Sequence, residues 1–241
     1  MKNVLITREK EQFEEVKKLF EKEGFNPISF PTIKFEKIPL EGFNEREFDF
    51  LIFTSKNAVK IFLQQVALSK SKPIIAVGSK TAKFLVENGF ENVEIPDTFS
   101  SEGLKDYLYE NIERFKNKKF ALVRALEGSE VLLNQSEFEV KLIPVYKTVF
   151  NKPENIEEVE KMLKDKKIDA VVFSSPSTFK GFINVFGLDK TREFLEYPLV
   201  CAIGSVTEQE IKSHGIKVNI VPEKFTFEGI LEELKKRWNN Y

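Results

Sequence analysis

Two segments of this 241-residue chain repeat one pattern: DFLIFTSKNAVKIF at 49–62 and DAVVFSSPSTFKGF at 169–182. In each segment an aspartate opens an apolar run, a Phe precedes hydroxyl residues, and an amphipathic stretch closes on Phe. Every residue of the first segment lies 120 positions before its counterpart. A repeat spaced by half the chain favours two domains of similar build, because domains commonly span ~100–150 residues.

The repeat continues downstream with a constant offset of 126 residues. AVGSKTAKFLVENGFENVEIP (76–96) matches AIGSVTEQEIKSHGIKVNIVP (202–222), and TFSSEGLKDYL (98–108) matches KFTFEGILEEL (224–234). A weaker pair joins VLITRE and ALVRAL, in which an arginine follows an apolar run. We expect each member of this weaker pair to continue into a helix, a short strand and a proline.

Short apolar runs alternate with amphipathic segments along the chain. The runs lie at 4–7, 50–53, 74–77, 93–95, 120–123, 170–173, 199–203 and 218–221. The segments whose apolar residues recur at three and four lie at 12–23, 58–68, 81–88, 103–114, 156–165 and 229–238. This alternation is typical of parallel sheets with helices on both faces. The predicted fold class is α/β, with two parallel-sheet domains from an internal duplication, joined by a two-stranded β linker.

The linker is predicted from two alternating stretches, TIKFEKI and VYKTVFN, which follow prolines and are too isolated to join a parallel sheet easily. We expect them to pair with each other, at 32–40 and 145–152. The chain then crosses between domains twice. Residues 41–144 form one continuous domain, and residues 1–31 and 153–241 together form the other.

The charge balance limits the classes of partner. Lys and Arg number 37 against 38 Asp and Glu, which gives a net charge of −1. No overall field attracts the chain to nucleic acid or to anionic lipid. No apolar run approaches the ~20 residues of a membrane span, and the first residues turn charged before a signal-peptide core could form. We expect a cytoplasmic protein with no nucleic-acid or membrane partner.

Cysteine and histidine are too scarce for several kinds of site. Cys201 is the single cysteine, within LVCAIG, where a buried strand residue is expected rather than a nucleophile. His214 is the single histidine and precedes Gly215, where a helix should end; a cation there favours the helix dipole. We therefore expect no metal site and no Ser-His-Asp site.

Small hydroxyl and glycine residues mark the junctions between predicted strands and helices, where parallel sheets bind ligands and helix N-termini present free N–H groups. The candidate substrate-binding residues are Arg8, Thr54, Ser55, Lys56, Asn57, Gly78, Ser79, Thr81, Ser101, Arg124, Ser174, Ser175, Ser177, Gly204, Thr207, Phe225 and Thr226. The alternative at each hydroxyl is simple helix capping. Together the junctions would suit a large ligand with many carboxylates. The absence of GxGxxG and GxxxxGK[ST] counts against a dinucleotide or a P-loop nucleotide.

The segments FTSKNAV, AVGSKTA, VFSSPST, AIGSVTE, the paired F-x-x-E-G motifs and IPVYKT resemble, in this order and spacing, the uroporphyrinogen-III synthase family over essentially the whole chain. The resemblance implies a cofactor-free, monomeric hydro-lyase of tetrapyrrole and heme biosynthesis. Such enzymes cyclise hydroxymethylbilane, a linear tetrapyrrole with eight carboxylates, to uroporphyrinogen III in the cleft between two α/β domains. Water is lost and the last pyrrole ring is inverted. Two copies of the strand-end pattern would hold one polyanion.

The resemblance also implies roles for individual residues. Tyr146, in the linker motif VY-x-T, corresponds to the tyrosine proposed as the acid that assists loss of the hydroxyl. The alternative is that its ring only packs against the linker. Arg8 and Arg124 would each bind a propionate or an acetate, with a structural ion pair as the alternative.

The two G-S-x-T motifs offer a choice of ligand contacts. We expect Thr81 and Thr207 to contact the ligand in preference to Ser79 and Ser205. The capping alternative applies to these positions as well.

Two functions from other classes remain. A non-catalytic two-domain binding protein for a small anion would share the duplication, although the expected export signal is missing. A regulatory ligand-sensing domain would also share it, although no basic or helix-turn-helix segment is present for DNA. Only an enzyme would change the isomer ratio formed from hydroxymethylbilane.

Overall fold

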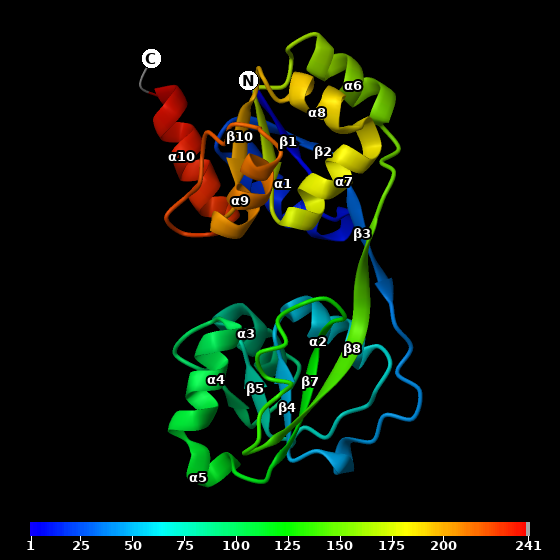
Figure 1. Cartoon of the computed structure of the whole chain (residues 1–241), viewed down its shortest axis with the longest axis vertical. Helices are drawn as coiled ribbons and strands as arrows, with labels where there is room; N and C mark the ends of the chain where they lie inside the picture. The colour runs from blue at the N-terminus through cyan, green and yellow to red at the C-terminus, as the bar shows by residue number, and fades with distance from the viewer. Residues whose placement is uncertain (240–241) are drawn as a thin grey trace. The chain divides into compact units, whose positions relative to one another are not determined.

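The computed structural model describes residues 1–239, and the chain divides into two compact units (Figure 1). Unit 1 comprises residues 1–34 together with the chain from residue 149 onward, and unit 2 comprises residues 35–148. The chain therefore passes from one unit to the other twice. No helix within residues 1–239 combines the length and apolar character that crossing a membrane requires.

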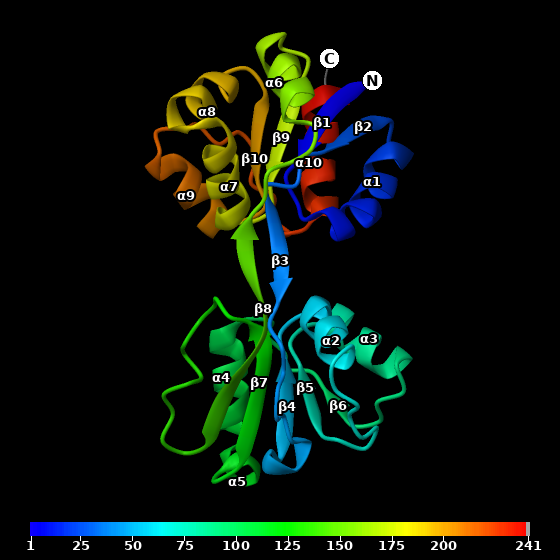
Figure 2. The same ribbon diagram turned by 90° about the vertical axis from the view of Figure 1, so that its right-hand side faces the viewer.

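Unit 2 is a sheet with strand order β3-β8-β7-β4-β5-β6, covered on both faces. The strands are β3 (Ile33–Lys37), β4 (Phe50–Phe53), β5 (Ile74–Ala76), β6 (Val93–Glu94), β7 (Lys119–Ala125) and β8 (Glu139–Phe150). The helices are the short 3-10 helix η2 (Glu45–Glu47), α2 (Lys56–Leu63), α3 (Ser79–Glu87), α4 (Ser101–Glu110) and α5 (Ile112–Phe115). One core packs α2 and α3 on the sheet, and a second packs α4 and α5 on the opposite face (Figure 2).

Unit 1 has a parallel sheet with strand order β10-β9-β1-β2. The strands are β1 (Lys2–Ile6), β2 (Phe25–Ser29), β9 (Ala170–Phe173) and β10 (Leu199–Ala202). The helices are η1 (Lys10–Gln12), α1 (Phe13–Lys22), α6 (Ile156–Lys164), α7 (Pro176–Phe186), α8 (Leu188–Phe194), α9 (Ser205–Ser213) and α10 (Phe227–Asn239). Helices α6 to α9 cover one face, and α1 and α10 cover the other (Figure 2).

The parallel strands of the two units follow the same order. Through the sequence repeat, β4 corresponds to β9, β5 to β10 and β7 to β1. Unit 2 reads β8-β7-β4-β5-β6, and unit 1 reads β2-β1-β9-β10 with a bridge from Cys201 to Ile220 in the place of β6. In both units the strand order reverses between two central strands, which are β7 and β4 in unit 2 and β1 and β9 in unit 1.

The aspartate that opens each repeat has the same role in both units. Asp49 Oδ2 accepts a hydrogen bond from Lys119 N (2.9 Å), and Asp169 Oδ2 accepts one from Asn3 N (2.8 Å). Each carboxylate thereby ties the start of a central strand to the first residues of its neighbour. The hydrogen bond from Lys119 N lowers the pKa of Asp49, and Lys118 adds to the effect.

Strand β8 corrects the predicted linker. It begins at Glu139 and pairs in parallel with β7 up to Tyr146, so the first part of 145–152 belongs to the sheet of unit 2. The pairing of β8 with β7 does not stop at Pro144. It shifts register beside Ala125 and continues to Tyr146. β8 also neighbours β3: Val145 O accepts from Ile38 N, and Asn151 N donates to Thr32 O, both at 2.9 Å.

Two expected elements are replaced by irregular backbone. The helix expected after Arg124 is absent, and residues 126–138 form turns, in which Leu126 O and Ser129 O accept hydrogen bonds from the Arg124 guanidinium. The strand expected at 218–221 is reduced to the Ile220 bridge. There Asn219 Oδ1 accepts from Val200 N at 2.8 Å, where a regular ladder would offer a backbone carbonyl.

Two expected helices have other bounds. Helix α2 stops at Leu63, short of residue 68, and Gln65 Nε2 donates back to Ile61 O at 3.4 Å. The helix expected at 103–114 is split into α4 and α5 at Asn111, whose Nδ2 donates to Tyr107 O at 2.9 Å. In both cases a side-chain amide satisfies the last carbonyls and ends the helix.

We predict that Asp49→Asn lowers the free energy of unfolding at neutral pH but not in acid. A carboxyl group with a lowered pKa in the folded state stabilises the protein above its unfolded pKa of about 3.9 and loses this effect as the pH falls through the folded pKa. Urea unfolding at pH 7 and at about pH 3 should show a gap between wild type and variant that closes in acid. Asp97→Asn, at an exposed position outside the helices and strands, is the control. An equal gap at both pH values would contradict the role of the ionised carboxylate.

Candidate functional site

The carboxyl ends of β4, β5 and β7 lie at one edge of the unit 2 sheet, where three helices begin. Ser55 Oγ accepts from Ala58 N (3.1 Å) and caps α2, and Ser100 Oγ accepts from Gly103 N (3.0 Å) and caps α4. Helix α3 follows Gly78, which has a φ of 103° and provides no side-chain cap. This φ favours glycine, and the first N–H groups of α3 have no side-chain acceptor at the cap position.

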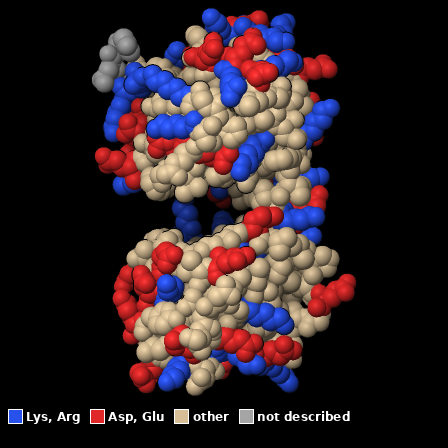
Figure 3. Space-filling model, in the orientation of Figure 1, with Lys and Arg blue, Asp and Glu red and all other residues tan. Residues whose placement is uncertain are grey.

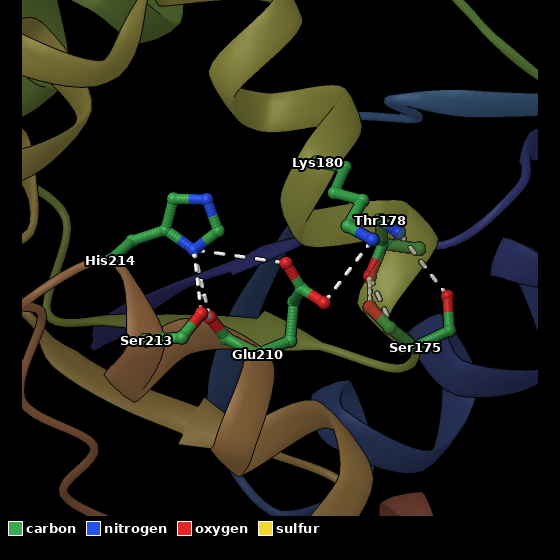
Figure 4. Close-up of polar contacts among 6 residues, drawn as sticks. All are labelled: Ser175, Thr178, Lys180, Glu210, Ser213 and His214. Atoms are coloured by element: carbon green, nitrogen blue, oxygen red, sulfur yellow. Dashed lines mark hydrogen bonds and ion pairs between the residues drawn. The ribbon is translucent and has the colours of Figure 1, made fainter.

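Unit 1 repeats this arrangement. Ser175 and Thr178 form a capping box at the start of α7, with Ser175 Oγ accepting from Thr178 N and Thr178 Oγ1 from Ser175 N, both at 3.2 Å (Figure 4). Thr226 Oγ1 accepts from Gly229 N (3.1 Å) at the start of α10. Helix α9 follows Gly204 without a side-chain cap. The capping interpretation is confirmed for Ser55, Ser175 and Thr226, and the uncapped starts of α3 and α9 form a matched pair.

Burial separates the residues of the two G-S-x-T motifs. Thr81 and Thr207 are only 4% and 3% exposed, whereas Ser79 and Ser205 are exposed. Thr81 Oγ1 donates to Val77 O at 3.4 Å. In α3 and α9 the third residue, Thr81 or Thr207, is buried, whereas the first residue, Ser79 or Ser205, faces outward. The serines are therefore the more accessible pair, and the expected preference for the threonines as ligand contacts stays a prediction.

The remaining hydroxyl and amide candidates lie near the start of α2 and of α7. Asn57 Nδ2 is buried and has no hydrogen-bond partner, so this amide could still donate to a ligand. Lys56 is exposed, and its Nζ lies 5.3 Å from the ring centre of Phe84. Ser174 follows β9 and Ser177 lies in the first turn of α7, and both are half-buried.

Arg8 and Arg124 follow equivalent strands but have different surroundings. Arg8 Nε donates to Gln12 Oε1 (2.8 Å), and its guanidinium carbon lies 5.0 Å from the ring centre of Phe227. Arg124 is 7% exposed; its Nη1 donates to Ala125 O (3.0 Å) and its Nη2 to Ser129 O (3.2 Å). Burial lowers the pKa of both arginines. Arg124 Nε is buried without an acceptor.

Arg124 lines a pocket of about 190 Å³ in unit 2. Thr54 at the end of β4 and Ser101 at the start of α4 line the same pocket, so the structure brings these three candidates together. Phe99 and Ser129 also line it, and neither is among the candidate substrate-binding residues predicted from the sequence. The sequence repeat could have identified Phe99, because Phe99 lies 126 positions before the candidate Phe225.

Phe99 and Phe225 are exposed aromatic residues at matched positions. Their exposed fractions are 58% and 61%, although a phenylalanine is usually buried. Each stands just before the helix that carries the Glu-Gly pair, α4 or α10. The ring of Phe225 also packs on Gly204, where a Cβ atom would lie 3.3 Å from Phe225 Cγ. The two rings are available to contact an apolar part of a ligand.

Tyr146 lies in the core of unit 2. It is 9% exposed, and its ring centre is 4.8 Å from that of Phe35 at an angle of 57°. Its backbone carbonyl accepts from Leu126 N at 2.8 Å. The packing role proposed as the alternative is therefore present, and a role as an acid would have to use the small exposed part of the side chain.

The single histidine and cysteine take the structural roles expected. His214 is the C-cap of α9; its Nδ1 contacts Glu210 O (2.9 Å) and Ser213 Oγ (3.1 Å), and Glu210 also pairs with Lys180 (Figure 4). Cys201 is fully buried in β10, and burial raises the pKa of its thiol well above the ordinary value. Within residues 1–239 no cluster of three His, Cys, Asp or Glu side chains has a geometry that could hold a metal ion.

On the face that Figure 3 shows, charge of both signs is mixed in each unit. This agrees with the net charge of −1. An anionic ligand would therefore depend on local N–H, hydroxyl and guanidinium donors more than on a long-range field.

Comparison with known proteins decides the family. Residues 14–232 match the model of the family described as uroporphyrinogen-III synthase HemD. The chain belongs to this family. A member from Archaeoglobus fulgidus is 34% identical over 236 residues, covering 97% of this chain and 98% of that protein. A uroporphyrinogen-III synthase from Chlorobaculum parvum is 30% identical over 239 residues, covering 93% of this chain and 94% of the relative.

Solved structures support the α/β fold of the uroporphyrinogen-III synthase family. The crystal structure of uroporphyrinogen-III synthetase from Helicobacter pylori matches with a TM-score of 0.70 at 22% identity, over 98% of this chain and all of that one. A uroporphyrinogen III synthase from Thermus thermophilus matches with a TM-score of 0.63 at 21% identity, over the full length of both chains. At this identity the likeness concerns the fold alone.

We predict that the two serines at the start of α7 in this family member differ in effect. Ser175→Ala removes the N-cap and should lower the free energy of unfolding by about 1 kcal/mol. Ser177 is the second residue of α7 and takes no part in the capping box, so Ser177→Ala should change the free energy of unfolding by less than about 0.5 kcal/mol. Chemical denaturation of both variants makes the measurement. Equal losses would show that the assigned cap does not stabilise α7.

Proposed function

We propose that this chain is a uroporphyrinogen-III synthase, which converts hydroxymethylbilane to uroporphyrinogen III. The observation that carries the proposal is the family match over residues 14–232, together with relatives of the same name that align over nearly their full length. The enzyme is a cofactor-independent, cyclising lyase of porphyrin and heme biosynthesis.

The reaction requires three changes in the substrate. The terminal hydroxymethyl group loses its oxygen as water, the last pyrrole ring attacks in the inverted orientation through a spiro intermediate, and the macrocycle closes. An electron-rich pyrrole expels the hydroxyl readily, so the protein has less need of a strong acid. The harder task is to hold the other three rings while the last one turns.

The strand ends support binding of a substrate with eight carboxylates. Backbone N–H groups at the uncapped starts of α3 and α9 can donate to carboxylates, and the helix dipole favours negative charge there. The exposed Ser79 and Ser205 add hydroxyl donors at the same places. Phe99 and Phe225 offer apolar surface for the pyrrole rings. Each unit thus provides one set of donors with one aromatic ring.

The division of the chain fits an internal duplication with an exchanged segment. The common strand order and the equivalent bonds of Asp49 and Asp169 support this origin. In this proposal, the β-α-β segment of one copy completes the sheet of the other. The linker strands β3 and β8 are the places where the exchange occurs.

Product analysis is the direct test of the proposed function. Purified protein incubated with hydroxymethylbilane should release mainly the type III isomer of uroporphyrinogen, whereas the uncatalysed reaction gives type I. A binding protein or a sensing domain would leave the isomer ratio at its uncatalysed value. That result would overturn the proposal in favour of a non-catalytic function.

The proposed acid is Tyr146, and the prediction concerns its hydroxyl. Tyr146→Phe keeps the packing on Phe35, so a loss of rate reports on proton transfer more than on folding. We expect the rate to fall by roughly 10- to 100-fold, at or below the low end of general-acid effects, while the product remains mostly type III. The measurement is the steady-state rate with isomer analysis.

Tyr197→Phe is the matched control for this variant, because Tyr197 is 53% exposed in unit 1. It should leave the rate unchanged. An unchanged rate for Tyr146→Phe would remove Tyr146 as the acid and leave only its packing role. A Tyr146→Phe variant that folds but releases mainly type I would show that this residue controls ring inversion.

A further inference from the structure

The contacts that hold Tyr146 in place continue beyond the end of the parallel ladder between β7 and β8. The ladder pairs Ala125 with Tyr146 after the register shift, and Tyr146 O then accepts from Leu126 N at 2.8 Å. Hydrogen bonds between parallel strands alternate in direction, so the next bond of a regular ladder would run from Thr148 N to Leu126 O. Here Thr148 N donates to Glu127 Oε2 at 3.2 Å instead. A side-chain carboxylate thus replaces a strand carbonyl.

The turn that carries Glu127 is organised around the Arg124 guanidinium. Arg124 Nη1 donates to Leu126 O (3.4 Å), and Nη2 donates to Ser129 O (3.2 Å). Gly128 lies against the same group, where a Cβ atom would collide with Arg124 Nη1, and its φ of 151° favours glycine. The Leu126 carbonyl is therefore engaged by Arg124, and the Glu127 carboxylate is the acceptor that faces β8.

The opposite edge of β8 is held by β3, since β8 lies between β3 and β7 in the sheet. Val145 O accepts from Ile38 N at 2.9 Å. The rings of Phe35 and Tyr146 pack with their centres 4.8 Å apart. β3 thus restrains β8 at Tyr146 and just before it, and the Glu127 carboxylate restrains the strand two residues beyond.

A small displacement of β8 would matter for the chemistry of Tyr146. The residue is 9% exposed, so only a small part of its side chain can reach a substrate. A general acid has to lie within hydrogen-bond reach of the group it protonates, at about 2.6–3.2 Å, and a misplacement of about 1 Å can lower a rate roughly 100-fold. Thr148 is the last residue of unit 2, so its bond to Glu127 restrains the strand where it leaves this unit.

We infer that Glu127 is a positioning residue for Tyr146: its carboxylate accepts the Thr148 N–H and so holds the tyrosine hydroxyl where it can donate a proton. The inference rests on the proposed function, in which Tyr146 is the acid. Glu127 acts through the backbone of β8 and not on the substrate. Arg124 supports the arrangement by holding the turn from which Glu127 reaches the strand.

Steady-state kinetics with hydroxymethylbilane test the role of the acceptor. Glu127→Met removes the acceptor, and we expect kcat to fall by roughly three- to tenfold because the hydroxyl is misplaced but still present. KM should stay within about twofold, since the variant affects the chemical step and not binding. Glu127→Gln keeps an oxygen acceptor without the charge and should restore kcat to within about twofold of wild type. Glu130→Met, at an exposed carboxylate of the same irregular segment, is the matched control and should leave both constants unchanged.

Two kinetic outcomes would overturn the inference. Equal losses of kcat in Glu127→Gln and Glu127→Met would show that the charge matters and the hydrogen-bond acceptor does not. A rise in KM with an unchanged kcat in Glu127→Met would place its effect on substrate binding instead of on the proton donor.

A double-mutant cycle separates positioning from a general structural role. If Glu127 acts through the Tyr146 hydroxyl, Glu127→Met added to Tyr146→Phe should leave the rate within about twofold of Tyr146→Phe alone, because the hydroxyl it positions is gone. A further loss as large as in the wild-type background would overturn the inference and leave Glu127 with a structural role only. A wild-type rate for Tyr146→Phe would overturn it as well, since no hydroxyl would then need positioning.

The position of the tyrosine can also be followed without turnover, in the full chain labelled with ¹³C at the tyrosine rings and with ¹⁵N at the amides. The chain has five tyrosines, and Tyr146→Phe identifies the Tyr146 resonances by their loss. Glu127→Met should shift these resonances and the Thr148 amide, whereas Glu127→Gln and Glu130→Met should leave both close to wild type. Unshifted Tyr146 resonances in Glu127→Met would overturn the inference.

Failure of this inference is distinct from failure of the proposed function. Type III product from Glu127→Met at the wild-type rate overturns only the positioning role. A wild-type chain that forms no type III product, with the Tyr146 resonances still displaced in Glu127→Met, overturns the synthase and supports Glu127 as the residue that places this side chain.

Discussion

The parallel pairing of β1 with β9 is the interaction on which unit 1 depends, because it joins two parts of the chain that all of unit 2 separates. Val4, Leu5 and Ile6 pair with Ala170, Val171 and Val172, and all six are fully buried. Thr7 Oγ1 extends the ladder by donating to Val172 O at 2.8 Å. Without this pairing, the apolar faces covered by α1 and α10 and by α6 to α9 would have no common sheet.

Repetition of a fold does not impose repetition of its surface. The aspartates at the strand starts keep the same role in both units, because each carboxylate accepts a hydrogen bond from the backbone of the neighbouring strand. The glycines before α3 and α9 leave both helices without a side-chain cap. Arg8, which follows β1, and Arg124, near the end of β7, have no such common backbone contact. One is covered by a helix and an aromatic ring, and the other anchors an irregular segment beside a pocket.

Sequence periodicity predicted most of the architecture and part of the site. The repeat and the strand–helix alternation indicated the α/β class. The hydroxyl and arginine residues near strand ends and helix starts included Thr54, Ser101 and Arg124, which line one pocket. The turns after Arg124 and the interrupted strand at Asn219 were missed because the side chains of these two residues bond to backbone groups, and hydrophobic periodicity does not register such contacts. The burial of Thr81 and Thr207 depends on which side of a helix meets the sheet, which a four-residue motif does not define.

The discontinuity of unit 1 has a consequence for synthesis of the chain. β1 leaves the ribosome early with β2 as its only available neighbour, and β9 follows about 160 residues later. At a translation rate of ~5–20 residues per second, this delay is roughly 10–30 s. Unit 2 is contiguous and complete within that interval. The apolar side chains of β1 therefore stay without their packing partners while all of unit 2 is made. That exposed strand is the part of the nascent chain most open to chaperones or to wrong pairing.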